Sequence, residues 1–113
     1  IKMPGKEGKE KIEAILKRVR EKSPKEINGQ EVIVKKDYLL SKEYNLRTEE
    51  ETQLDLPESN VLQFKLADKS LVTVRPSGTE PKIKFYFSVV ADSDAEARGK
   101  LKQLKTAMMR LVE

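Results

Sequence analysis

A polar loop between two apolar runs carries the residues whose types are suited to binding a ligand. Residues 75–82 read Arg-Pro-Ser-Gly-Thr-Glu-Pro-Lys, and the two prolines remove N–H donors that a continuous strand would need. Ser77 and Thr79 offer hydroxyl groups, and Gly78 lets the backbone adopt a positive φ angle with its N–H exposed. Arg75 adds a planar set of donors that matches phosphate oxygens. Such donors, converging from a tight turn, predict an anion-binding site, although the same residue types are equally ordinary in the polar turn of a β-hairpin.

The composition excludes several other kinds of chemistry. The 113 residues correspond to a single domain, and the net charge of +4 comes from 23 basic residues dispersed among 19 acidic ones. Dispersed charge favours a solvated surface over a nucleic-acid-binding face. The chain has no histidine and no cysteine, which removes Ser-His triads, histidine or cysteine metal sites and disulfides, and we expect a cytoplasmic protein. No apolar run approaches membrane-spanning length, no signal peptide is visible, and the first residue, Ile1, suggests an excised or processed fragment.

Hydrophobic periodicity predicts the elements that position the loop. Residues 9–22 place apolar side chains on one helical face, and a second helix follows Ser93 and Glu96, which have the spacing of a capping box. The apolar stripe of this second helix is expected at Ala97, Leu101, Leu104, Met108 and Leu111. Four stretches alternate apolar and polar residues as strands do: residues 30–40, 61–67, 71–75 and 83–89.

The remaining stretches define the domain organisation. Residues 1–8 read as a loose lead-in, residues 9–113 as a single domain, and residues 41–60 as a long surface loop without periodicity. Both helices need an apolar partner, and the sheet has one apolar face to offer. We therefore expect an α+β fold in which a four-stranded antiparallel sheet carries two helices packed on one face.

The loop and its flanks resemble a known family. Residues 74–87 read Val-Arg-Pro-Ser-Gly-Thr-Glu-Pro-Lys-Ile-Lys-Phe-Tyr-Phe, which resembles the phosphate-binding loop of the phosphohexomutases, most closely the phosphoglucomutase/phosphomannomutase branch. The likeness covers the chain from about residue 9 and includes Asp37-Tyr38, residues 54–57 leading into 59–62, and the closing helix. It implies the C-terminal, fourth domain of such an enzyme, with a fold similar to the TATA-box-binding-protein-like α+β sheet.

The resemblance also implies a role for the loop. Arg75, Ser77, Gly78 and Thr79 would grip the phosphate of a hexose phosphate that is not reacting, and Lys84 lies where some relatives have a second basic residue. The implied substrates are glucose 1-phosphate, glucose 6-phosphate or their mannose counterparts. These are interconverted in the parent enzymes through a hexose 1,6-bisphosphate, with a phosphoserine and Mg²⁺ in other domains. For this domain alone we expect no catalytic residue, no cofactor, no membrane partner and no activity.

Two alternatives remain at this point. A small nucleic-acid-binding module is suggested by the basic charge and by Phe85-Tyr86-Phe87 beside lysines. It lacks the element order and the glycine-bearing aromatic motif of an RNA-recognition fold, so we expect no nucleic acid partner. A protein-interaction module is suggested by the acidic stretch 41–60, and this role is compatible with contact to other domains of a parent chain.

Overall fold

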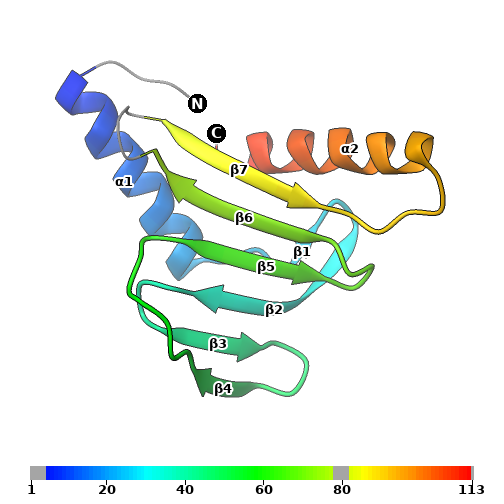
Figure 1. The fold of residues 1–113 in the computed structure, drawn as a ribbon. Helices are drawn as coiled ribbons and strands as arrows, with labels where there is room; N and C mark the ends of the chain where they lie inside the picture. The colour runs from blue at the N-terminus through cyan, green and yellow to red at the C-terminus, as the bar shows by residue number, and fades with distance from the viewer. Residues whose placement is uncertain (1–4, 78–81, 113) are drawn as a thin grey trace.

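The computed structural model describes residues 5–77 and 82–112, which run from one helix through seven strands to a second helix (Figure 1). In chain order the elements are α1 (Gly5–Glu21), β1 (Glu26–Ile27), β2 (Gln30–Asp37), β3 (Lys42–Asn45), β4 (Glu50–Gln53), β5 (Leu62–Leu66), β6 (Leu71–Pro76), β7 (Ile83–Ser88) and α2 (Asp94–Val112). Because α1 begins at Gly5, residues 5–8, which were expected in the lead-in, are helical.

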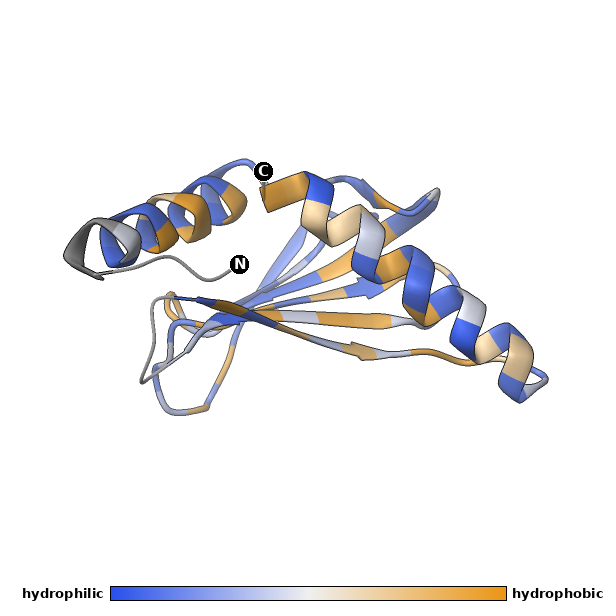
Figure 2. Cartoon of the chain, turned by 90° about the horizontal axis from the view of Figure 1, so that it is seen from above, coloured by the Kyte–Doolittle hydropathy of each residue, from blue (hydrophilic) through white to orange (hydrophobic). Residues whose placement is uncertain are grey.

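The two helices cover the same face of the sheet and leave the other face open (Figure 2). On β5, Leu62 and Phe64 are buried on the face that the helices cover. Gln63 and Lys65, which alternate with them along the strand, lie on the opposite face, here called the open face. One apolar cluster forms where the two helices pack on the sheet. Its members are Ile12, Ile15, Leu16 and Val19 of α1, Leu104, Met108 and Val112 of α2, and Ile27, Val32, Leu62, Phe64, Leu66, Val72, Val74 and Ile83 of the sheet. The predicted two-layer α+β arrangement with both helices on one face is confirmed.

The second helix begins as its sequence predicts but buries a shorter stripe. The hydroxyl of Ser93 accepts a hydrogen bond from the backbone N–H of Glu96 at 3.1 Å, which caps the helix as the spacing of these two residues predicts. The Glu96 carboxylate accepts a hydrogen bond from the Asp92 N–H at 3.4 Å, one residue before the N–H that a capping box would use. The buried residues of α2 all lie in its C-terminal half, and Leu101 is 36% exposed. The expected stripe is therefore wrong at Leu101, because only the later turns are covered by the core. Among the described helices, none has the length and apolarity needed to cross a membrane.

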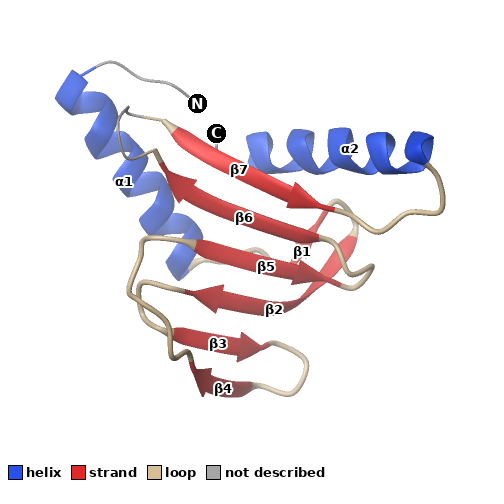
Figure 3. Ribbon diagram, in the orientation of Figure 1, coloured by secondary structure: helices blue, strands red, loops and turns tan. Residues whose placement is uncertain are grey.

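The sheet is antiparallel throughout and contains seven strands among the described residues (Figure 3). Six of them lie in the order β4-β3-β2-β5-β6-β7, and β1 pairs with β2 beside this path. The four predicted strands correspond to β2, β5, β6 and β7, and they lie side by side in the sheet. The prediction of a four-stranded sheet is wrong, because β1, β3 and β4 add three strands to it.

The added hairpin lies within residues 41–60, so the prediction of a long surface loop there is also wrong. Strands β3 and β4 carry no buried residue, and every residue of β4 is exposed, so they show no alternation of apolar and polar residues. Their turn is built by Asn45, whose side-chain oxygen accepts hydrogen bonds from the N–H groups of Arg47 and Thr48. Backbone pairing and turn chemistry, rather than burial, hold this edge of the sheet together.

Candidate functional site

The β6–β7 hairpin brings the two ends of the polar loop together. Its register places Arg75 directly opposite Lys84. The backbone N–H of Ser77 then donates a hydrogen bond to the carbonyl oxygen of Lys82 at 2.9 Å, which closes the loop at its root. We call Arg75, Ser77 and Lys84 the loop base, since all three lie where the strands end and the loop begins.

Alternation along the two strands assigns Arg75 and Lys84 of the loop base to the open face. Val74 and Ile83 are buried under the helices, so their neighbours Arg75 and Lys84 extend from the other side of the sheet. Arg75 is exposed and Lys84 is half-buried. The alternation of apolar and polar residues in 83–89 predicts Lys84 on the polar face of the strand, opposite Ile83, and the structure confirms this prediction.

Three of the five expected site residues therefore lie within one hairpin end. Arg75, Ser77 and Lys84 are brought together there by strand pairing. The other two, Gly78 and Thr79, fall on residues 78–81, outside the described part of the chain. The arrangement brings a guanidinium, an ammonium and a hydroxyl-bearing side chain to the same end of the sheet.

The electrostatics of the loop base favour an anion. Two cations directly opposite one another weaken a strand pair, because like charges repel at that separation. Among the described residues, no carboxylate lies within ion-pairing distance of either Arg75 or Lys84. A bound anion would reduce this repulsion and accept hydrogen bonds from the guanidinium.

An aromatic side chain outside the predicted set of site residues contacts Arg75. The Arg75 Cζ atom lies 5.7 Å from the centroid of the Tyr86 ring, and Tyr86 is 48% exposed on the open face. Tyr86 pairs with Thr73, so it is the diagonal neighbour of Arg75 across the two strands. The sequence pattern places Tyr86 on the polar face, but only the register of the hairpin, read together with this face, links it to Arg75.

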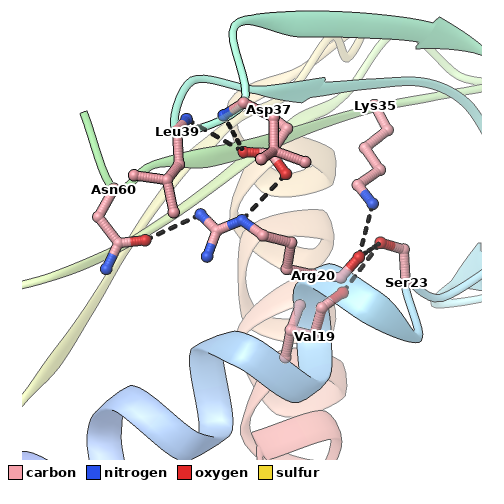
Figure 4. Close-up of polar contacts among 8 residues, drawn as sticks. Val19, Arg20, Ser23, Lys35, Asp37, Leu39 and Asn60 are labelled. Carbon is pink, nitrogen blue, oxygen red and sulfur yellow. Dashed lines mark hydrogen bonds and ion pairs between the residues drawn. The ribbon is translucent and has the colours of Figure 1, made fainter. Parts of the chain in front are cut away.

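A second polar cluster joins α1 to the end of β2 (Figure 4). The Asp37 carboxylate is fully buried, and one of its oxygens accepts a hydrogen bond from Arg20 Nε at 2.9 Å. Its other oxygen accepts from the backbone N–H groups of Leu39 and Leu40 at 3.1 and 3.2 Å. Arg20 Nη2 donates to the side-chain oxygen of Asn60 at 2.8 Å. Because these internal partners occupy the acceptors of Asp37, the cluster stabilises the fold and offers little to a ligand.

Lys35 completes the same cluster from the middle of β2. Its Nζ donates a hydrogen bond to the carbonyl oxygen of Arg20 at 2.7 Å and lies 5.4 Å from the centroid of the Tyr44 ring. Burial lowers the pKa of Lys35 below its ordinary value of 10.5; the charge of Asp37 opposes this shift, and that of Arg20 adds to it. The Lys35 ammonium is thus partly buried and hydrogen-bonded to a backbone carbonyl near the C-terminal end of α1.

Two further features bear on what the chain can bind. A hollow of about 500 Å³ lies beside the β3–β4 hairpin, and its lining includes Glu31, Glu49 and Glu50. Three carboxylates against one lysine, Lys25, make this hollow unfavourable for a phosphate. Within the described ranges, no three His, Cys, Asp or Glu side chains converge to hold a metal ion.

Comparison with known proteins gives consistent matches. A family model described as "Phosphoglucomutase/phosphomannomutase, C-terminal domain" matches residues 1–105. The chain is 46% identical over 87 residues to a phosphoglucomutase of Staphylococcus aureus strain MRSA252, and 45% identical over 87 residues to those of strains MSSA476 and MW2. Each match covers 77% of this chain and 16% of the relative, so the chain corresponds to a small part of the relatives' length. No solved structure matches the chain.

Proposed function

Because this chain belongs to the phosphoglucomutase/phosphomannomutase family and is a C-terminal domain of that family, we propose that its loop base binds the phosphate of a hexose phosphate. The observation that carries the proposal is the pairing of Arg75 with Lys84 on the open face, with no carboxylate partner among the described residues. A phosphate dianion balances the charge of these two cations, and its oxygens can accept hydrogen bonds from both side chains.

The proposed roles follow from the donors that each residue carries. Arg75 presents two parallel N–H groups to two phosphate oxygens, and Lys84 adds a single ammonium from the neighbouring strand. Ser77 contributes its hydroxyl, and the family resemblance assigns a backbone N–H to Gly78 and a hydroxyl to Thr79. Toward a phosphate dianion all of these groups act as hydrogen-bond donors, so they fix the orientation of a sugar phosphate and do not react with it.

Within a mutase, such a site would hold the phosphate that is not reacting. A sugar bisphosphate must present each of its two phosphates in turn to the reacting group, and a site that donates hydrogen bonds to phosphate oxygens can bind either one. Closure of this domain over the substrate would also exclude water from a phosphoserine elsewhere in a longer protein. The phosphoserine, Mg²⁺ and the turnover of a hexose 1,6-bisphosphate belong in this proposal to the part of the relatives' length that the chain does not cover.

The strength of binding to the domain alone is limited. Hydrogen bonds to a charged group contribute about 1.5–3 kcal/mol each when protected, and Arg75 is exposed. Ordering of the exposed side chains and loss of ligand freedom offset much of this, so we expect a Kd for glucose 1-phosphate no tighter than about 1 mM. Mutase turnover by the domain alone is expected to be absent.

An amide and side-chain chemical-shift titration tests the proposal. Glucose 1-phosphate and glucose 6-phosphate are added to the 113-residue chain, and shifts are expected at Ser77, at the Arg75 guanidinium and in the loop between them and Lys84. Arg75→Ala is expected to weaken binding by about tenfold, which corresponds to the loss of one charge-assisted hydrogen bond.

Lys65→Ala is the matched control, since it removes an exposed cation from the same open face away from the loop. It is expected to change the Kd by less than about twofold, because surface charges at a distance are screened by salt. Equal weakening by both substitutions would mean that the face attracts anions without a site. Tight, steeply salt-dependent binding of short oligonucleotides along Lys84 and Tyr86 would favour the nucleic-acid alternative instead.

A further inference from the structure

We propose that Tyr86 is a positioning residue: its ring holds the Arg75 guanidinium at the loop base so that the N–H groups of Arg75 are available to a phosphate. This inference rests on the proposed function, since it concerns how the same site is prepared for its ligand. Tyr86 is 48% exposed on the open face and does not belong to the core, so packing of the core does not explain its presence there.

The contact between the two side chains follows from the hairpin register. Arg75 pairs with Lys84 and Tyr86 pairs with Thr73, so Arg75 and Tyr86 are diagonal neighbours on the open face. The guanidinium carbon lies 5.7 Å from the ring centroid, within the range in which a cation is attracted to an aromatic face. Tyr86 leaves nearly half of its surface exposed, so burial does not account for an aromatic residue at this position.

An aromatic partner suits this arginine better than a carboxylate would. A carboxylate near Arg75 would occupy its N–H groups and would have to be displaced by the incoming phosphate. An aromatic ring attracts the charged guanidinium through the ring face, and it accepts none of the in-plane hydrogen bonds that phosphate recognition needs. Tyr86 therefore restrains a long side chain without competing for its donors.

The position of Tyr86 is itself well determined. On the other side of β7, Phe85 and Phe87 stack on each other with ring centroids 6.2 Å apart and pack against the core. On the open face, Thr73 lies opposite Tyr86 and accepts a hydrogen bond from Gln63 Nε2 at 3.1 Å. The backbone that carries the ring is thus fixed from both sides of the strand.

The expected effect is modest and has a defined size. A cation–aromatic contact at an exposed site corresponds to about a two- to fivefold change in an equilibrium constant. Tyr86→Leu removes the ring, and Tyr86→Phe retains it while removing the hydroxyl. We therefore expect Tyr86→Leu to weaken glucose 1-phosphate binding about two- to fivefold, and Tyr86→Phe to leave it unchanged.

The test measures binding and the side chain of Arg75 together. In the unsubstituted 113-residue chain without ligand, the Arg75 Nε–H proton is expected slightly upfield of its free-arginine position, because the guanidinium carbon lies over the ring, 5.7 Å from its centroid. This displacement should persist in Tyr86→Phe and disappear in Tyr86→Leu. Ser88→Ala, which lies on the same face and strand beyond Tyr86, is expected to alter neither the resonance nor the Kd.

The outcomes separate this inference from the proposed function. If Arg75→Ala weakens binding about tenfold while Tyr86→Leu binds as tightly as the unsubstituted chain, the positioning role is wrong and the phosphate site stands. An Arg75 Nε–H resonance at the free-arginine position in the parent chain would also refute the positioning role, without any variant. If the parent chain does not bind glucose 1-phosphate at the loop base, the proposed function fails, and the ring contact, if detected, is only structural.

Discussion

Removing the Asp37 carboxylate is expected to cost far more stability than removing an exposed carboxylate whose ion pair has nearly the same length. The Asp37 side chain is fully buried, its partner Arg20 is 13% exposed, and their N–O distance is 2.9 Å. The comparison pair is Glu31 with Arg47, where the distance is 2.8 Å but the side chains are 53% and 54% exposed. The two pairs differ in burial and hardly at all in geometry.

The magnitude follows from what each substitution leaves behind. Asp37→Ala leaves the Arg20 charge largely buried and strips the N–H groups of Leu39 and Leu40 of their acceptor, for which we expect a loss of about 3–5 kcal/mol. Glu31→Ala leaves Arg47 in water and should cost less than about 1 kcal/mol. A domain of this size has a free energy of unfolding of about 5–15 kcal/mol, so the first loss is a large fraction of the total.

Urea denaturation followed by circular dichroism measures both losses. Asp37→Asn is the informative third variant, because its amide can accept on one side only and must point a donor at either Arg20 or the two backbone N–H groups. It is expected to lie between the other two, at about 2–3 kcal/mol. If both Asp37→Ala and Glu31→Ala lower the free energy of unfolding by the same amount, with the same m-value as the unsubstituted chain, burial does not decide the strength of these ion pairs.

Two further predictions concern stability. The pKa of Lys35 is lowered in the folded chain, so between that lowered pKa and 10.5 the unfolded chain binds more protons than the folded chain. Deprotonation of Lys35 should therefore increase the free energy of unfolding as the pH rises through this interval. Lys35→Met should lack that contribution, and parallel pH profiles for parent and variant would contradict the burial of the ammonium. Gly29 has a φ of +75° with open space around it, so Gly29→Ala should destabilise by about 1 kcal/mol through backbone strain alone. Gly99→Ala, in equally open space within α2, should instead stabilise by about 0.5–1 kcal/mol, and the same sign for both in thermal unfolding would exclude strain as the cause.

The sequence could predict the elements that bury apolar residues. The spacing of apolar residues predicts a helical face at Ile12, Ile15, Leu16 and Val19, and it predicts strands where β5, β6 and β7 lie. All of these elements form. The same alternation predicts that Tyr86 and Lys84 share the open face, as they do. Such predictions succeed because the burial of apolar surface is the strongest force that favours folding, and a periodic apolar face shows which side of an element is buried.

The elements that escaped prediction are those held by backbone and polar contacts. Strand β4 has no buried residue, and β1 is only two residues long, so neither strand has an alternating pattern of apolar residues that could be recognised in the sequence. The Asn28-Gly29 turn before β2 did carry a signal, since both residues adopt positive φ angles of 52° and 75° in the tight hairpin between β1 and β2. The burial of Asp37 could not be read from its type, because a carboxylate is buried only when distant partners such as Arg20 and Asn60 meet it.

The residues of the proposed site could be named from the sequence, whereas the arrangement of those that the structure describes could not. Arg75 and Ser77 follow from donor chemistry and from the family resemblance, whereas the pairing of Arg75 with Lys84 requires the register of the hairpin. The contact with Tyr86 requires the register and a side-chain conformation together. Neither can be obtained from the order of residue types alone.

A crystal structure of the chain with glucose 1-phosphate tests the central claim most directly. The account predicts that the phosphoryl group lies against the Arg75 guanidinium and the Ser77 hydroxyl, with the Lys84 ammonium on its other side. A phosphoryl group bound instead by dispersed lysines such as Lys65, with Arg75 turned to solvent and unligated, would contradict it.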